Sequence, residues 1–472
     1  MATRERKDVY KLPAGDRTLY WYGRAITALR ARATTEPTSW RYQAAIHGFD
    51  AASPFWAGAG TLPPSTERSR FWDQCQHGTW YFLPWHRMYL AYFEQIVLQT
   101  IVSLGGPSTW ALPFWNYSDT TNPAALTMPP AFTSGTPASN PLQMPAAGGL
   151  PGRVNTVLQA RDVSLTNALA SRVFVGMYTG GSTGFGGVIT GFNHLGNGHG
   201  LVEYTPHDFV HADIGGAMND VATAALDPIF WLHHANIDRL WQVWLNQGGR
   251  SNPTDSRWLT QPFSFHDSRR NVVTLTPAQV MNTTLILGGY TYQGVHPVAG
   301  EGVEEGLARE EREPVHCGST TGPIHLEGQA EELTFHFNPG MDAPYRDDAD
   351  AWLNFEAIIG KGIAPIHDVY VNMPERCADP ERYLLCSLPL FGSDMPPGHG
   401  RHGMGITYAV NVTAMVEELR ERGEWRPGTM RLHIQPRAQH DGGHGYGHRH
   451  GHGHPRRGHW HVTIGRLTFY GQ

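Results

Sequence analysis

The spacing of apolar residues divides this chain into two parts that must fold differently. Residues 18–33, 85–101 and 228–246 repeat apolar side chains every three or four positions, which predicts amphipathic helices. After Tyr292 the apolar runs shorten and alternate with polar residues between Gly and Pro turns, which is typical of strands. With 472 residues the chain is long enough for two hydrophobic cores. We therefore predict a mainly α domain followed by an all-β sandwich domain.

A charged segment marks the boundary between the two parts. The run GEGVEEGLAREEREP falls within residues 296–320 and indicates an exposed linker. The predicted domains are thus a helical domain over 1–295, the linker over 296–320 and the sandwich over 321–472. Inside the sandwich, the His-rich loop 440–461 is of low complexity. It is either a tolerated loop expansion or a collector of metal ions.

Composition excludes several classes of protein. Charged residues make up 17% of the chain and the net charge is −6, which gives no reason to expect a nucleic-acid partner. No run of about 18 apolar residues occurs, so no membrane-spanning helix is expected. Residues 1–11 lack the apolar core of a signal peptide, so we expect a cytoplasmic protein. Lysine occurs only at positions 7, 11 and 361 beside abundant arginine, a bias that indicates a GC-rich bacterial genome.

Histidines at helical spacing indicate a metal site in the first part. His207 and His211 stand four residues apart after Pro206, a residue that suits the first turn of a helix. Residues four apart lie on one helical face, so both imidazoles can reach one ion. His233 and His234 follow on the next predicted helix. Because neighbouring side chains of a helix point about 100° apart, these two are not expected to share one metal.

Asp238 favours one of these two neighbours as a ligand. It stands four residues after His234 and can accept the second ring proton of that imidazole, as carboxylates beside metal-bound histidines do. The residue four after His233 is Ile237, which cannot accept a proton. We therefore predict His234 as the third ligand and His233 as a packed or hydrogen-bonded helix residue.

A second histidine cluster lies upstream, at His47, His77 and His86. A single histidine among aromatic residues is more often a core residue than a ligand, but two clusters of three favour metal binding. Sites made only of imidazole suit copper or zinc, and copper binds more tightly at equal geometry. The run from His207 to His211 has an acid directly after its first histidine, a superficial match to HExxH hydrolases that keeps zinc as an alternative.

These clusters resemble the two copper-binding motifs of tyrosinases, catechol oxidases and molluscan haemocyanins. The best-matching segment is FWLHHANIDRLW, residues 230–241, and the resemblance runs from about Arg6 to Tyr292. It implies a four-helix-bundle core that holds two copper ions and uses O2, with Phe230 packed against the imidazoles. The implied ligands of the first copper (CuA) are His47, His77 and His86. Those of the second copper (CuB) are His207, His211 and His234.

The same resemblance extends to two smaller features. Cys75 lies two residues before His77, as in fungal members of the family in which this pair is joined by a thioether bond. The resemblance implies the same link here, and an ordinary buried cysteine is the alternative. Residues 290–292 are similar to the tyrosine motif that closes the family's catalytic domain, with Arg6 as the implied N-terminal partner.

Glu203 and Asp208 are the implied catalytic side chains. Glu203 stands four residues before His207, where family members often hold a water near the coppers; the alternative is a helix-start carboxylate favoured by the helix dipole. Asp208 departs from the Asn that the family often carries after the first CuB histidine. An Asp there either accepts a phenolic proton or adds charge that blunts the basicity of the water, so monophenol hydroxylation stays open.

The function implied by the resemblance is that of a type 3 copper polyphenol oxidase, which converts o-diphenols and monophenols to o-quinones with O2. An o-aminophenol oxidase and a haemocyanin-like O2 carrier would share the six histidines and remain alternatives. In long members of the family a C-terminal domain covers the copper site, so the sandwich is expected to act as a cover and the chain to be latent. The run 388–391 either plugs the entrance or is an ordinary buried strand. The expected partner is a small phenol, and the oligomeric state stays open.

Overall fold

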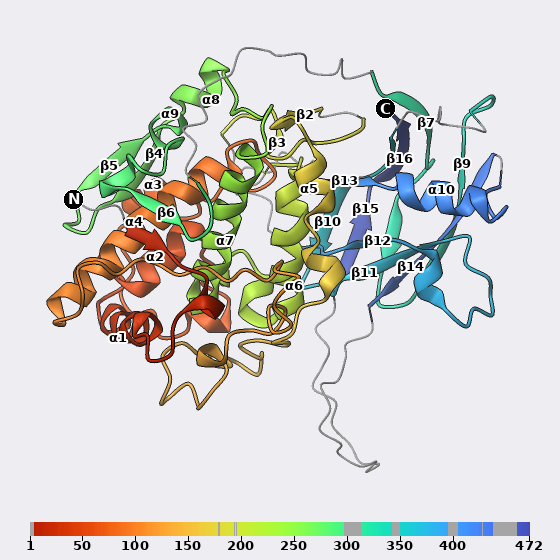
Figure 1. The fold of residues 1–472 in the computed structure, drawn as a ribbon. Helices are drawn as coiled ribbons and strands as arrows, with labels where there is room; N and C mark the ends of the chain where they lie inside the picture. Colours follow the sequence, from red (N-terminus) through yellow and green to blue (C-terminus); the bar gives the residue numbers. More distant parts are fainter. Residues whose placement is uncertain are drawn as a thin grey trace, which may run out of the picture.

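The computed structural model describes residues 4–177, 180–192, 194, 196–296, 313–341, 350–394, 405–426, 428–437 and 460–472. Figure 1 shows a helical part and a strand-rich part side by side, with α6 (Phe209–Ile214) on the side of the helices that faces the strands. Most of the predicted linker and most of the His-rich loop lie outside the described residues.

The helical part is built around two buried helices. α4 (Phe82–Ser103) packs against α1 (Thr18–Arg30) and α7 (Pro228–Leu245), and nearly all of α7 is buried. The start of α7 follows from its sequence, because the Asp227 carboxylate accepts from the N–H of Ile229 and a proline occupies the first helical position. The remaining helices are shorter: α2 (Trp40–His47), α3 (Ser65–Phe71), α5 (Thr166–Ala170), η5 (Glu203–Asp208), α8 (Ser256–Thr260) and α9 (Pro277–Val280).

Within the described residues, the helical region contains three short strand pairs, one of which joins distant parts of the chain. β1 (Arg4–Arg6) runs parallel to β6 (Tyr290–Tyr292), β2 (Val175–Gly176) pairs with β3 (Gly187–Val188), and β4 (Phe263–His266) pairs with β5 (Val272–Leu275). Arg6 is fully buried and donates from Nη1 to the Tyr292 hydroxyl at 2.7 Å. The implied pairing of Arg6 with the tyrosine motif is therefore present, and it ties the start of the described chain to residue 292.

Two sheets that share one apolar core make up the strand-rich part. At the centre of the larger sheet, β10 (Ala351–Lys361) pairs with β13 (Ile406–Asn411) on one side and with β15 (His461–Ile464) and β16 (Arg466–Gly471) on the other. β8 (Ile324–Leu326) and β7 (Val315–Ser319) extend that sheet, and the smaller sheet has the order β12 (Leu384–Leu388), β11 (His367–Val371), β14 (Thr429–Pro436), β9 (Glu331–His336). All of these pairings are antiparallel, and α10 (Thr413–Glu421) interrupts the strands.

The structure corrects the sequence-based boundaries in two places. β7 lies inside the predicted linker 296–320. The sequence did not predict this strand, because its partner β16 is far away in the sequence and a five-residue strand gives little local signal. At the end of the chain, where the sequence pattern suggests one strand from His461 to Tyr470, the structure has two, β15 and β16. These two pair with opposite ends of β10, whose register shifts near Ala357, a residue with a positive φ of 56°.

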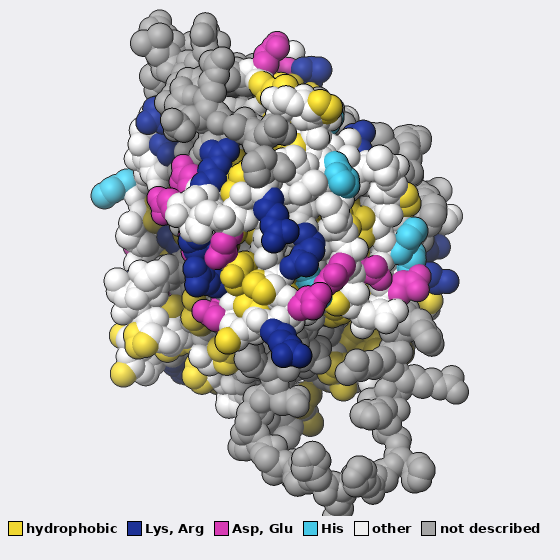
Figure 2. All heavy atoms as spheres, turned by 90° about the vertical axis from the view of Figure 1, so that its right-hand side faces the viewer, with side chains coloured by type: hydrophobic (Ala, Val, Ile, Leu, Met, Phe, Trp, Pro, Cys, Tyr) yellow, Lys and Arg dark blue, Asp and Glu magenta, His cyan; other side chains and the backbone are white. Residues whose placement is uncertain are grey.

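The outer face of the strand-rich part carries mixed charge. Figure 2 shows basic and acidic side chains interspersed on this side of the molecule. Ion pairs within this part include Arg422 with Glu418 at 2.9 Å and Arg466 with Glu356 at 2.5 Å. Within the described chain, no helix combines the length and the apolar character that crossing a bilayer requires.

Candidate metal centre

The six predicted ligands meet between the helices and are all buried. Rings from the two clusters face one another: His86 stacks on His234 with centroids 4.5 Å apart, and His77 lies 5.5 Å from His207. Four helical segments and one loop carry these histidines. In the first cluster, His47 ends α2, His77 lies in the loop before α4 and His86 lies on α4. In the second, His207 and His211 lie on the turns of η5 and α6, and His234 lies on α7. Thr205 leaves the helical conformation, so the turn that carries His207 and His211 starts at Pro206, as predicted.

Most of these rings are anchored at one nitrogen and unpaired at the other. Backbone carbonyls accept from Nδ1 of His47, His86 and His211, at 2.9, 2.8 and 2.7 Å. The opposite atom, Nε2, is buried without a partner in His47, His77, His86 and His207. The Nε2 atoms of His211 and His234 lie 3.3 Å apart. Because burying unpaired polar nitrogen is costly, this convergence of Nε2 atoms fits bound metal ions.

The chemistry of the donors favours copper. Ligand atoms of His47, His86 and His234 lie within 4.8 Å of one another, as do those of His207, His211, His233 and His234. Burial lowers the pKa of His86 and of His211 to about 3, so both rings are neutral and can coordinate near neutral pH. These two sets contain imidazole alone, a donor type that suits copper, and a third set joins His47 and His77 with the Cys75 thiol. A zinc hydrolase would need Asp208 as its general base, but histidines already contact both oxygens of the Asp208 carboxylate.

The neighbours His233 and His234 differ in their contacts. His233 Nδ1 lies 3.0 Å from the Tyr117 hydroxyl, and its ring stacks on that of His207 at 5.3 Å. The His234 ring packs on Phe230 at 4.1 Å and points its Nε2 toward His211. His233 is therefore hydrogen-bonded as predicted, but it also stands beside the second set as a fourth imidazole.

The prediction that Asp238 accepts a proton from His234 is wrong. His234 Nδ1 has no hydrogen-bond partner, while the Asp238 carboxylate accepts from Arg87 at 2.5 Å and from both tyrosine hydroxyls of the 290–292 motif at 2.6 Å. Burial alone would raise the pKa of Asp238, but Arg87 and Arg6 outweigh it and hold that pKa below its usual value. Charged guanidinium groups compete successfully with a neutral imidazole for a buried carboxylate.

Cys75 lies against the predicted thioether partner. Its Sγ is 3.2 Å from His77 Nδ1 and 3.3 Å from His194 Nδ1, and the cysteine is free and buried. His194 also hydrogen-bonds the Cys75 carbonyl at 2.8 Å. His194 was absent from the sequence-based site, although it stands in a Gly- and His-rich stretch just before the second cluster.

Glu203 and Asp208 occupy different environments. Glu203 Oε1 accepts from the N–H of Gly78 at 2.8 Å, whereas Oε2 is buried without a partner. Burial raises the pKa of Glu203 to about 8, so this carboxyl can exchange a proton near neutral pH. Asp208 is held by His207 and by His199, a residue that the sequence analysis also missed. Its signal was the four-residue spacing from His199 to Glu203.

A phenylalanine of the strand-rich part packs against the histidines. Phe391 is buried and stacks on His211 with centroids 4.1 Å apart and an angle of 14°, and it lies 5.8 Å from His77. The residue before it, Leu390, has a positive φ of 57°, a conformation that L-residues rarely adopt. On the other side, Phe230 packs against His47 at 4.9 Å. Imidazoles of both clusters are thus walled by aromatic rings from both parts of the chain.

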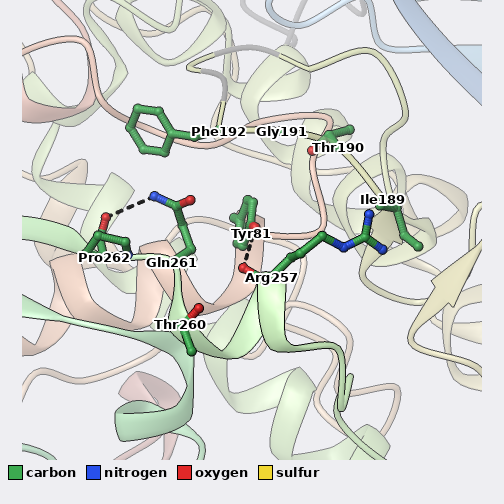
Figure 3. A pocket seen from close by; sticks show the side chains of 9 residues that line it. All are labelled: Tyr81, Ile189, Thr190, Gly191, Phe192, Arg257, Thr260, Gln261 and Pro262. Atoms are coloured by element: carbon green, nitrogen blue, oxygen red, sulfur yellow. Dashed lines mark hydrogen bonds between the residues drawn. The ribbon is translucent and has the colours of Figure 1, made fainter.

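A surface pocket lies apart from the six histidines. It has a volume of about 580 Å³ and is lined by Tyr81, Phe192, Arg257 and their neighbours. Figure 3 shows these side chains around the opening, with the Tyr81 hydroxyl bonded to the Arg257 carbonyl at 3.0 Å. None of the six predicted ligands lines this pocket.

Comparisons with known proteins cover nearly the whole chain. Residues 37–247 match the common central domain of tyrosinase, residues 252–299 match the polyphenol oxidase middle domain, and residues 310–445 match a domain of unknown function. The chain is 37% identical over 460 residues to a tyrosinase of Hahella sp. (strain CCB-MM4), with 92% of this chain and 96% of that protein covered. It is 29% identical to a chloroplastic polyphenol oxidase of Malus domestica, over 58% of this chain and 46% of that protein.

Solved structures resemble both parts of the fold. The structure of latent apple tyrosinase superposes with a TM-score of 0.61 at 21% identity, covering 100% of this chain and 98% of that one. A latent aurone synthase superposes with a TM-score of 0.59 at 19% identity, covering 99% and 89%. At these identities the likeness establishes the fold alone, namely a helical core followed by a C-terminal sheet region.

Proposed function

The chain belongs to the tyrosinase family of type 3 copper phenol oxidases, and from that premise we propose that it is a latent o-diphenol oxidase whose strand-rich part closes the copper site. The observation that carries this proposal is the stack of Phe391 on His211, in the space between the two sets of imidazoles. A phenol ring would need the same space to reach the metals.

The copper ligands are proposed from the burial of the six rings and from the resemblance of the two histidine clusters to the copper motifs of the family. His47, His77 and His86 would hold one ion, and His207, His211 and His234 the other, which leaves His233 bonded to Tyr117. α2, α4, the η5–α6 turn and α7 carry five of these histidines and would form the four-helix core. Residues 1–295 would form the catalytic domain, and the strands from β7 onward the cover.

The copper ions, when bound, supply O2 activation and accept the two electrons of the substrate. The protein would bind and orient the phenol in the space that Phe391 occupies beside His211 and His77, and the aromatic walls exclude water. Oxidation of an o-diphenol releases two protons as well as two electrons. Glu203 is the proposed proton acceptor, because its Oε2 is unpaired and its pKa of about 8 lies near the operating range.

A full-length Phe391→Ala variant tests the cover. Removing the phenyl ring vacates a space the size of the substrate ring and weakens the closed form, so we expect catechol oxidation by the copper-loaded chain to rise about tenfold or more. Quinone absorbance measures the rate. Phe391→Leu keeps an apolar plug and should stay closer to the natural chain.

The same assay distinguishes the alternatives. Reversible O2 binding without quinone in any variant would contradict the oxidase and indicate a carrier. Faster turnover of o-aminophenol than of catechol would shift the substrate class while leaving the cover intact. No change on Phe391→Ala, with two coppers bound, would contradict the plug.

Monophenol hydroxylation should depend on Glu203 more than on Asp208. The Asp208 oxygens are already occupied by two imidazoles, so Glu203 is left to take the phenolic proton. We expect Glu203→Gln to lower monophenol turnover by about 10²-fold and catechol turnover much less, since catechol is the easier substrate. Steady-state rates on tyrosol and catechol check this, and an unchanged monophenol rate would contradict the role of Glu203 as the proton acceptor.

The thioether is a third proposal, supported by the 3.2 Å contact of Cys75 Sγ with the His77 ring. Joining sulfur to a ring carbon removes two hydrogen atoms. We therefore expect copper loading in air to lower the intact mass by two hydrogens and to block thiol labelling at Cys75. Cys75→Ser should keep its mass on loading. A labelled Cys75 in the active, copper-loaded chain would contradict the link.

A further inference from the structure

Two imidazoles contact the Asp208 carboxylate, and one of them, that of His199, is not a proposed copper ligand. Oδ1 lies 2.8 Å from His207 Nδ1, and Oδ2 lies 2.7 Å from His199 Nδ1. All three side chains are buried. We propose that His199 is a positioning residue for His207 that acts through Asp208, an inference that rests on the proposed copper centre.

The chemistry of the ligand requires such support. A histidine that coordinates through Nε2 carries its proton on Nδ1, so His207 donates to Asp208 Oδ1. One hydrogen bond alone leaves the carboxylate free to turn about its Cβ–Cγ bond. The second hydrogen bond, from His199 to Oδ2, fixes the carboxylate plane and with it the direction of His207 Nε2.

His207 depends on this support more than the other anchored ligands do. Backbone carbonyls hold His47, His86 and His211, and a carbonyl is fixed by its own helix or turn. Among the described contacts of the proposed ligands, only that of His207 runs through a side-chain carboxylate. Loss of His199 should therefore weaken one copper and spare the other.

His199 has attachments of its own that keep its ring in place. Its carbonyl accepts from Thr183 Oγ1 at 2.7 Å, and the N–H of Gly198 donates to the Gly78 carbonyl at 3.1 Å. The ring of Tyr408, from β13 of the strand-rich part, packs edge-on against the imidazole at 5.3 Å. His199 thus holds Asp208 from a position fixed by its own backbone and by the cover.

Copper alone is the probe for the test. The full-length apoprotein is loaded with copper and titrated with a competing chelator, and bound copper per chain is measured. We expect His199→Phe, which keeps the ring against Tyr408 but removes the donor, to bind one of its two coppers about 10- to 100-fold more weakly. His199→Asn places an amide N–H near the position of Nδ1 and should recover most of that affinity.

A matched control separates positioning from folding. His266 is another buried histidine beside a carboxylate, 3.5 Å from Glu67 and outside the ligand sets, so His266→Phe should leave both copper affinities unchanged. Natural affinity for both ions in His199→Phe would overturn the proposal. Equal losses in His199→Phe and His199→Asn, with a lower unfolding temperature of the apoprotein, would also overturn it. A natural chain that binds no copper would instead refute the proposed centre itself.

Discussion

We expect Arg437→Leu to raise the rate at which the full-length chain oxidises catechol by at least tenfold. Arg437 lies at the end of β14 and binds residues of both parts. It donates to Asp368 and to Ser387 Oγ at 2.8 Å within the strand-rich part, and it pairs with Asp162 of the helical part. Removing one partner of a buried ion pair costs about 3–5 kcal/mol, which is roughly a 10²- to 10⁴-fold change in the equilibrium between closed and open forms.

The carboxylates left behind explain why the effect should fall on the interface. Asp213 of α6 lies 3.8 Å from Arg437. Burial, with Asp162 adding to it, raises the pKa of Asp213 to about 8. Without the guanidinium, two buried acids of the helical part would face Asp368 of the cover. Separation of the two parts would hydrate all three, so the variant should favour the open form.

Arg422→Leu is the matched control for this effect. Arg422 is partly buried and pairs with Glu418 at 2.9 Å and Glu424 at 3.3 Å, all within the strand-rich part. Its loss should lower stability without releasing the cover. A similar rise in both variants would attribute activation to general loosening of the sandwich, and no rise in Arg437→Leu would show that other contacts hold the cover closed.

We expect His234→Gln to lower the rate of catechol oxidation by roughly 10³-fold or more, whereas His233→Gln should keep most of that rate. His234 lies between the two sets, with its ring on His86 and its Nε2 toward His211. The two-electron chemistry needs both metals, so losing one ligand of this kind removes the whole function. His233 makes its hydrogen bond to Tyr117 instead.

Copper content decides the assignment independently of activity. We expect His234→Gln to retain one copper per chain and His233→Gln to retain two, with apoprotein unfolding temperatures alike. The reverse pattern would make His233 the ligand and would contradict the choice made from Asp238, whose contact with His234 the structure already removes.

The sequence identified the histidines because their signals are local. Spacings of four residues, as between His207 and His211, place side chains on one helical face in any fold that keeps the helix. The length and apolar period of α7 likewise do not depend on neighbouring elements. The resemblance to a known family then supplied copper as the metal and paired the clusters, which spacing alone left open.

Other features depend on residues far apart in the sequence. The sequence could not assign Asp238, because its choice between a nearby imidazole and distant guanidinium groups depends on where Arg6 and Arg87 arrive. Nor could it separate a plug from an ordinary strand at 388–391, since Phe391 reaches His211 only when the two parts dock.

What the sequence by itself determined is the two clusters of histidines, the helices that carry most of them and the alternating strands that follow. Tertiary structure decided which buried groups share a proton or a charge, including His199 with Asp208 and Arg437 with Asp162. The physical reason is that helical periodicity follows from backbone geometry over a few residues. The energy of a buried polar group, in contrast, depends on every partner that folding brings within hydrogen-bond distance.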